Sequence, residues 1–218
     1  MSQSEPAPRE VQHRVTCGLL MGAQIALPTP SFDDKAEFFD ILESRRSLQP
    51  QREIDNNALG RLLWYGARCK ERAIDPRGIT RQRRPFPSAG GLHEQEIIVV
   101  RHEYRDVSRY DGVTHALSSA QPEPERFLRF VEHVRCILEN DATLICLMAH
   151  KCVLEGAYLC NDSLLWRDAG CALAMMQLTA SALGFCSTLI GITGEDLAKA
   201  VPSSCSGFVA TGVMAVGL

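Results

Sequence analysis

Two basic side chains and a hydroxyl stand together at Arg45, Arg46 and Ser47, at the end of a helix expected at residues 35–44. Arginine suits phosphate because its planar guanidinium makes charge-assisted, often bidentate hydrogen bonds to phosphate oxygens. These three residues, with Gln49 just beyond them, are therefore a candidate phosphate site. The alternative interpretation is that both arginines are exposed cations, which are favoured at the C-terminus of a helix.

A second candidate group is the block Pro87-Ser88-Ala89-Gly90-Gly91, which precedes a strand expected at residues 96–101. The prolines restrict the approach of the chain, and the small residues let a ligand lie against bare main chain. An ordinary turn would account for one proline and one glycine. It does not require the whole block, so we interpret the block as a ligand-contacting loop.

The basic cluster at residues 77–84 has two open interpretations, a solvated loop or a loop that faces an anion. The nine cysteines are scattered and show no Cys-x-x-Cys pair. That pattern indicates small buried hydrophobes in a reducing compartment, without a zinc site. We interpret His150, Cys152 and Cys160 as ordinary strand-end and loop residues rather than as metal ligands.

The stretch at residues 162–184 predicts a central buried helix, because it is apolar on nearly every face. Asp162 or Ser163 is expected to cap its N-terminus, and Gly184 to end it in the left-handed conformation. Small residues along it indicate close approach by another helix, which could belong to a second subunit. Membrane insertion is disfavoured because charged residues interrupt the run.

The remaining elements alternate between helices and strands. Helices are expected at 55–68, 123–138 and 194–200, the last capped by Thr193, and strands at 143–149, 185–190 and 208–216. Asp111-Gly112 predicts a hairpin within 107–117, residues 15–27 an arm or edge strand, and residues 150–161 an irregular segment. The prediction is an α+β class with a helix-covered sheet, divided into a tail or arm at residues 1–30 and one domain at residues 31–218.

The composition of the chain limits the classes of partner that it is expected to bind. The formal net charge of −3 offers no general attraction to nucleic acid or to an anionic membrane. The apolar run at residues 17–27 begins late and lacks a clear cleavage site, so we do not expect export. Together with the cysteines, this predicts a cytoplasmic protein.

The candidate groups, taken in order, resemble one family, the nitroreductase superfamily of flavin enzymes. The resemblance covers about residues 42–218 and rests on Arg45-Arg46-Ser47, Pro87-Ser88-Ala89-Gly90-Gly91, Tyr110-Asp111-Gly112, and Asp168-Ala169-Gly170 leading to Ala182-Leu183-Gly184. The Pro-Ser-Ala-Gly-Gly and Tyr-Asp-Gly pieces resemble the SagB-type branch, which includes dehydrogenases that oxidise azoline rings in modified peptides.

The resemblance implies a nitroreductase-like fold with a central mixed or antiparallel sheet, an obligate homodimer and one FMN in each of two interface clefts. It places Arg45, Arg46, Ser47 and Gln49 against FMN from one subunit, and Pro87, Ser88, Ala89 and Gly90 from the other. Leu189, Ile190 and Gly191 match the segment whose backbone lines the flavin ring. The phosphate would be held by Arg45 and Arg46 alone, or by arginines of the basic cluster.

For catalysis, the resemblance points to the region before the central helix. Azoline-oxidising relatives have an adjacent Lys-Tyr pair there, whereas this chain has Tyr158 with Lys151 seven residues earlier. Tyr158 could keep part of that role with Lys151 as proton acceptor, or be a plain loop or interface aromatic. Three functions follow: an FMN-dependent dehydrogenase of a small-molecule or peptide-derived heterocycle, an NAD(P)H-dependent nitro or quinone reductase, and an inactive structural subunit working with other biosynthetic subunits.

Overall fold

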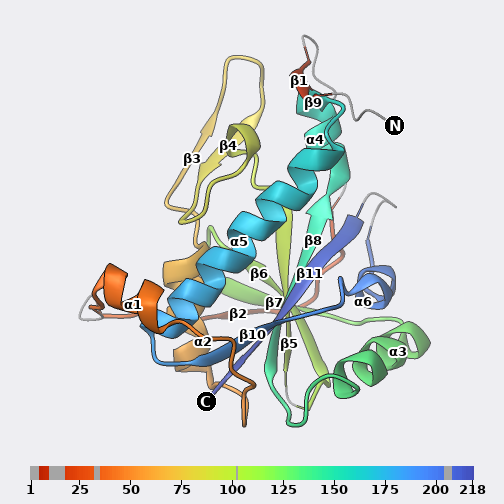
Figure 1. Ribbon diagram of the computed structural model, residues 1–218. Coiled ribbons are helices and arrows are strands. Elements are labelled where there is room, and N and C mark those ends of the chain that lie inside the picture. The colour runs from red at the N-terminus through yellow and green to blue at the C-terminus, as the bar shows by residue number, and fades with distance from the viewer. Residues whose placement is uncertain (1–4, 10–17, 32–34, 102, 204–207) are drawn as a thin grey trace.

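A seven-stranded antiparallel sheet forms the centre of the molecule, with strand order β10-β11-β8-β5-β6-β7-β2 (Figure 1). The computed structural model describes residues 5–9, 18–31, 35–101, 103–203 and 208–218. The strands are β2 (Gln24–Ala26), β5 (Gln95–Arg101), β6 (Asp106–Asp111), β7 (Ala116–Ala120), β8 (Thr143–His150), β10 (Cys186–Ile190) and β11 (Phe208–Gly217).

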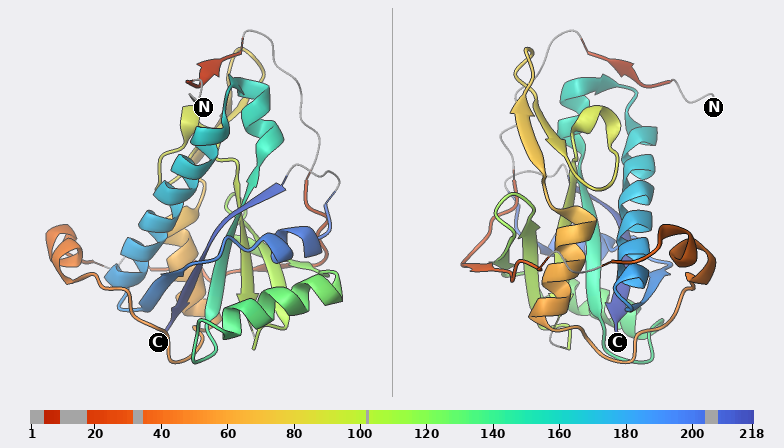
Figure 2. Two further views of the ribbon diagram at one scale, coloured as in Figure 1. Left: turned by 45° about the vertical axis from the view of Figure 1, so that its right-hand side comes forward. Right: turned by 90° about the vertical axis from the view of Figure 1, so that its left-hand side faces the viewer.

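Helices cover both faces of this sheet, as the two views in Figure 2 show. On one face lie α2 (Asn56–Ala67) and α5 (Asp162–Ala182), whose apolar side chains share a core with Ile97, Val99 and Met214. On the other lie α3 (Pro124–Arg135) and α6 (Glu195–Ala200), which pack on Ile98 and Val100. Because successive strand residues point to opposite faces, both faces of β5 are apolar and both are covered. The predicted α+β architecture is confirmed.

The predicted central helix is also confirmed as α5, with Gly184 at a φ of 77° just beyond its end. Its cap differs from the prediction, because Asn161 is the N-cap residue and neither Asp162 nor Ser163 takes that place. Burial is one-sided within the chain. Leu164, Leu165, Ala169, Ala172 and Met176 are buried, whereas Trp166, Gly170, Cys171 and Ala174 are exposed.

Helix α1 (Phe38–Ser44) is shorter than the predicted 35–44, and its aromatic side chains are exposed. The side chains of Phe38 and Phe39 are 59% and 78% exposed, and no residue of α1 is buried. In both figures α1 lies beside the C-terminal end of α5, away from the sheet. Within the described part of the chain, α1 contacts the end of α5 but buries none of its own residues fully.

Two segments predicted as loops are regular. The basic cluster belongs to a two-stranded hairpin of β3 (Glu71–Ile74) and β4 (Thr80–Arg83), and the segment predicted to be irregular contains α4 (Lys151–Ala157) and β9 (Tyr158–Leu159). Gly194, with a φ of 90°, takes the N-cap position of α6 that was predicted for Thr193.

The N-terminal region contributes two short strands. Strand β2 lies at the sheet edge against β7, which confirms an edge strand for part of residues 15–27. Strand β1 (Ala7–Pro8) pairs with β9, so that Ala7 lies opposite Leu159 and Pro8 opposite Tyr158. The division at residue 30 stays a prediction. Among the described residues, no helix has the length and apolar character that crossing a bilayer requires.

Candidate functional site

The predicted loop at Pro87–Gly91 is anchored on the central helix. The Ala89 amide donates to Asp168 Oδ2 at 2.6 Å, while Ser88 Oγ accepts from the His93 amide at 2.8 Å. Pro87 and Gly90 are exposed, and the 3-10 turn η1 (Ala89–Gly91) follows Ser88. The hydrogen bonds with Asp168 and His93 fix the turn, so its main chain presents a surface that is nearly free of side chains.

Gly90 is the residue of this loop with the strictest conformational demand. Its φ is 56°, a left-handed value that glycine adopts without a steric penalty. A Cβ at this position would stand 2.6 Å from the Tyr158 hydroxyl and 2.5 Å from Arg81 Nη1. The fold therefore brings the candidate catalytic Tyr158 to the candidate cofactor loop.

A buried carboxyl pair lies under the loop. Glu94 and Asp168 are 2% and 4% exposed, and Ser88 Oγ donates to Glu94 Oε2 at 3.4 Å. Burial and the nearby Asp168 carboxylate raise the pKa of Glu94 to about 7, because two like charges cannot both be accommodated there. Glu94 therefore keeps its proton up to near neutral pH, well above the range of an ordinary carboxyl group.

Gln95 connects this pair to the rest of the core. Its Nε2 donates to Glu94 Oε1 at 3.1 Å and to the Leu165 carbonyl at 3.0 Å, and its Oε1 accepts from Thr211 at 2.7 Å. A satisfied buried network of this kind rigidifies what it connects. It ties the loop to α5 and to β11.

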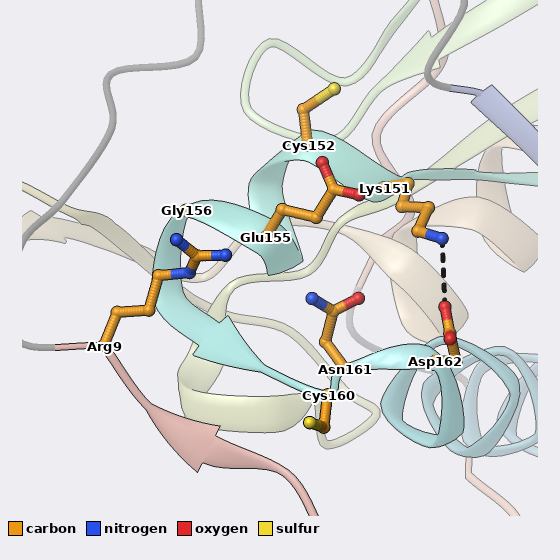
Figure 3. A pocket seen from close by; sticks show the side chains of 8 residues that line it. All are labelled: Arg9, Lys151, Cys152, Glu155, Gly156, Cys160, Asn161 and Asp162. Carbon is orange, nitrogen blue, oxygen red and sulfur yellow. Dashed lines mark ion pairs between the residues drawn. The ribbon is translucent and has the colours of Figure 1, made fainter. Parts of the chain in front are cut away.

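Lys151 lies in a different environment from Tyr158. Its ammonium is 3.0 Å from Asp162 Oδ1, and this contact raises the pKa of Lys151. Figure 3 shows Lys151 turned toward Asp162 in a cavity of about 460 Å³, which Tyr158 does not line. A lysine in this state carries its proton and cannot accept another, so Lys151 as proton acceptor stays a prediction that requires this ion pair to open.

Cys152 and Cys160 also line that cavity, on opposite sides in Figure 3. Among the described residues, no group of three or more histidine, cysteine, aspartate or glutamate side chains is arranged to hold a metal ion.

The residues predicted to bind phosphate, Arg45, Arg46 and Ser47, lie near the other end of α5. Ser47 Oγ is 3.5 Å from Gln177 Nε2, and the Leu48 amide donates to the Ser187 carbonyl of β10 at 2.9 Å. Arg46 Nη1 donates to two nearby main-chain oxygens, those of Glu43 and Arg45. Neither Arg45 nor Arg46 forms an ion pair with a carboxylate within the described residues.

Gln49 and the end of β10 complete this second group. The Gln49 amide reaches the α3–β8 connection, where it lies 3.4 Å from both the Ile137 carbonyl and the Glu139 amide. Leu189 is 43% exposed, Gly191 has open space where a Cβ would be, and Ile190 is buried in the core. The structure thus brings residues 45–49 beside β10.

The Pro87–Gly91 loop and residues 45–49 do not meet within one chain. Asp168, which holds Ala89, and Gln177, which contacts Ser47, are nine residues apart on α5, a rise of about 13.5 Å. The η1 turn and α1 lie near opposite ends of α5 in Figure 1. A site containing both would need residues from a second chain.

Comparison with known proteins decides the family. The model of the nitroreductase family matches residues 43–216, which is most of the chain.

The chain belongs to the nitroreductase family.

This assignment makes it an oxidoreductase and confirms the superfamily predicted from the sequence. Solved structures agree in fold. A chain named as a candidate nitroreductase from Ralstonia eutropha JMP134 is similar over 97% of both chains, at 15% identity and a TM-score of 0.61. A nitroreductase family protein from Clostridium novyi NT is similar over 84% of this chain and 85% of its own, at 15% identity and a TM-score of 0.50.

A further similar structure is the E. coli microcin synthetase McbBCD complex with truncated pro-MccB17 bound. The similarity covers 89% of this chain and 77% of that one, at 14% identity and a TM-score of 0.53. A search of the curated proteins found no match. At these identities the structural neighbours establish the fold of this nitroreductase family member.

Sequence reasoning missed Glu94 and Gln95, and it used Asp168 only as part of a motif. The polar run His93-Glu94-Gln95-Glu96 at the start of a buried strand was a usable signal, because polar residues at a strand's buried end need partners. The pairing of Glu94 with Asp168, 74 positions later in the sequence, could not be read from spacing.

Proposed function

We propose that this nitroreductase family member is an FMN-dependent oxidoreductase that is active as a homodimer. The observation that carries the proposal is the Ala89–Gly90 main chain, anchored through Asp168 and facing the Tyr158 hydroxyl. The candidate phosphate-binding residues lie beside β10, near the C-terminal end of α5, the helix that contains Asp168.

The residues present fit FMN. Arg45 and Arg46 carry guanidinium groups that no described carboxylate neutralises, which suits a phosphate. The bare main chain at Ala89–Gly90 and the open space at Gly191 suit a flat ring that requires close backbone contact. Ser47 and Gln49 would contribute hydroxyl and amide groups, and Pro87, Ser88, Leu189 and Ile190 would shape the surroundings.

A second copy of the chain would unite the two groups. The exposed aromatic residues of α1 and the exposed small residues of α5 form apolar surface that a soluble monomer rarely leaves uncovered. Gly170 has no atom within 4 Å of where its Cβ would stand, so another helix can approach closely there. The dimer would contain two equivalent clefts.

Bound FMN supplies hydride transfer, and the chain supplies binding, orientation and proton handling. Asp168 and Glu94 hold the loop in place. The Tyr158 hydroxyl, at the loop surface, is placed to donate a hydrogen bond to a substrate. Lys151 would act only after release from Asp162.

For the substrate, we propose oxidation of a small molecule or peptide-derived heterocycle, which is consistent with the similarity of the fold to the McbBCD complex and with the SagB-type motifs. A second candidate is an NAD(P)H-dependent nitro or quinone reductase. It is favoured by similarity to a candidate NADH oxidase from Clostridium acetobutylicum, at 16% identity and a TM-score of 0.51, over 82% of this chain and 86% of that chain. An inactive subunit of a biosynthetic complex is the third.

We place the protein in the cytoplasm, because the cysteines in the described part of the chain are all free thiols, as a reducing compartment maintains. We propose neither nucleic acid nor a membrane as a partner.

The first test is the absorption spectrum of the purified protein. We expect a flavin spectrum, and we expect the double variant R45A/R46A to lose FMN while R126A, a surface arginine of α3, retains it. Colourless protein that takes up no added FMN would refute the enzyme proposals and leave the inactive subunit. Rapid-mixing kinetics then separate the substrates, since bleaching by NADPH favours the reductase and bleaching only by a peptide heterocycle favours the dehydrogenase.

A further inference from the structure

The β3–β4 hairpin forms one wall of a cavity of about 640 Å³. Arg72 lies opposite Gln82 and Ile74 opposite Thr80 in the hairpin register. Directly opposed residues of an antiparallel pair share one face, and side chains alternate between faces along each strand. These four residues therefore share a face, Arg84 continues it, and all five line the cavity.

On the other face and at the turn, the hairpin arginines form ion pairs with carboxylates. Arg83 pairs with Glu71, and Arg81 and Arg77 lie 3.0 and 3.1 Å from Asp75 Oδ2. The basic cluster is thus divided by the alternation of the strands. Arg83 has Glu71 to itself, whereas Arg77 and Arg81 share the single carboxylate of Asp75.

The arginines that face the cavity differ. No carboxylate of the described residues lies within ion-pair distance of Arg72 or Arg84. Arg84 instead donates from Nε and Nη2 to the neutral Gln82 Oε1, at 3.0 and 2.9 Å. Burial lowers the pKa of Arg84, which reflects the cost of desolvating a cation without an adjacent anion. An anion that displaced Gln82 from the Nε and Nη2 edge would make the same paired contact with charge assistance.

His93 adds an acceptor to the same cavity. The residue is 7% exposed, has a φ of 49°, and its Nδ1 has no hydrogen-bond partner among the described residues. Burial and the Arg84 cation lower the pKa of His93 to about 4, so the ring is neutral at physiological pH. A neutral Nδ1 lone pair accepts a hydrogen bond from a ligand hydroxyl.

The other charged groups of the cavity are already satisfied. Arg109 donates to both oxygens of Glu96, at 2.7 and 3.2 Å. Glu94 belongs to the carboxyl pair with Asp168. Among the arginines that line the cavity, Arg72 and Arg84 are therefore the two without an ion-pair partner in the described part of the chain.

We propose that this cavity binds the phosphate monoester group of a small hydroxylated molecule, between Arg72 and Arg84, with His93 Nδ1 accepting from a ligand hydroxyl. A phosphate monoester carries a charge of about −1.5 to −2 at pH 7, which matches two guanidiniums, and its three terminal oxygens can serve two donor groups. The cavity volume is within the range of small-molecule sites, about 300–1,000 Å³. The site is distinct from Arg45 and Arg46, which directly follow α1, and α1 lies beside the other end of α5 (Figure 1).

The test is a binding titration of the full chain with inorganic phosphate, ribose 5-phosphate and uncharged ribose, followed by calorimetry and by phosphorus NMR. Ribose 5-phosphate is expected to bind, and R72Q and R84Q each to weaken it about tenfold or more, since each removes charge-assisted hydrogen bonds. R83Q, which changes the opposite face of the hairpin, is the matched control and is expected to shift affinity by less than about twofold.

Three outcomes would overturn the proposal: no saturable binding of either phosphate compound by the wild-type chain, equal losses in R83Q and R84Q, or binding of ribose as tight as that of ribose 5-phosphate. FMN content is measured on the same samples. Loss of FMN in R72Q and R84Q would place the flavin phosphate here and would also overturn a separate site. Arg72 is exposed, so R72Q keeps the test valid if R84Q fails to fold.

Discussion

Replacement of Glu94 by glutamine tests the buried carboxyl pair beneath the loop. Glutamine has nearly the same shape and does not titrate, so E94Q removes one acid from the pair while the side chain keeps hydrogen-bonding capacity. Burial and the Asp168 carboxylate raise the pKa of Glu94 from its ordinary 4.5 to about 7. Since one pKa unit corresponds to about 1.4 kcal/mol, the wild-type chain should lose up to about 3 kcal/mol of stability across this interval.

The sign follows from proton binding. Between pH 4.5 and 7 the folded state holds a proton on Glu94 that the unfolded state releases, so the free energy of unfolding falls as pH rises. Above about pH 7 this loss is complete. Relative to wild type, E94Q should therefore become progressively more stable from pH 4.5 to 7.5, by up to about 3 kcal/mol.

The assay is urea unfolding at equal protein concentrations over this pH range, followed by circular dichroism. E132Q is the matched control, because Glu132 is exposed on α3, and its difference from wild type should not follow the same pH course. A stability difference between E94Q and wild type that stays constant from pH 4.5 to 7.5 would refute the raised pKa of Glu94.

Three further predictions concern the loop, the candidate acid and a helix cap. G90A should lose FMN and at least about 1 kcal/mol of stability, because it combines a left-handed φ with a Cβ against Tyr158; flavin content and urea unfolding measure this, and full FMN retention would contradict it. Y158F should retain FMN but lower kcat about tenfold or more in steady-state assays, whereas unchanged kcat would leave Tyr158 a structural aromatic. D55A should cost about 1 kcal/mol in urea unfolding without changing FMN content, since Asp55 accepts from the Ala58 amide at 2.8 Å; no stability loss would count against this cap.

The elements with strong apolar patterns were predictable, and those stabilised by tertiary context were not. Helix α5 and strands β5, β8 and β11 are long and apolar, so periodicity identified them. Helix α4 has only seven residues, and its sequence Lys-Cys-Val-Leu-Glu-Gly-Ala shows little periodicity. The β3–β4 hairpin is rich in arginine and largely exposed, so it lacks the alternation of apolar and polar residues that marks a strand.

The candidate site shows the same division. The blocks at Arg45–Ser47 and Pro87–Gly91 were found because their residue types are unusual in combination. The contacts of Asp168 with Ala89 and of Lys151 with Asp162 depend on how elements pack, which local sequence does not encode. The exposure of α1 has a related cause, because the sequence pattern of a buried face does not tell which chain covers it.

The central claim is that two chains together hold FMN, and its most direct test is light scattering coupled to size-exclusion chromatography, with absorbance recorded at protein and flavin wavelengths. The account predicts one peak at twice the chain mass of 24.1 kDa with one FMN per chain. A flavin-loaded species at the mass of a single chain would contradict it.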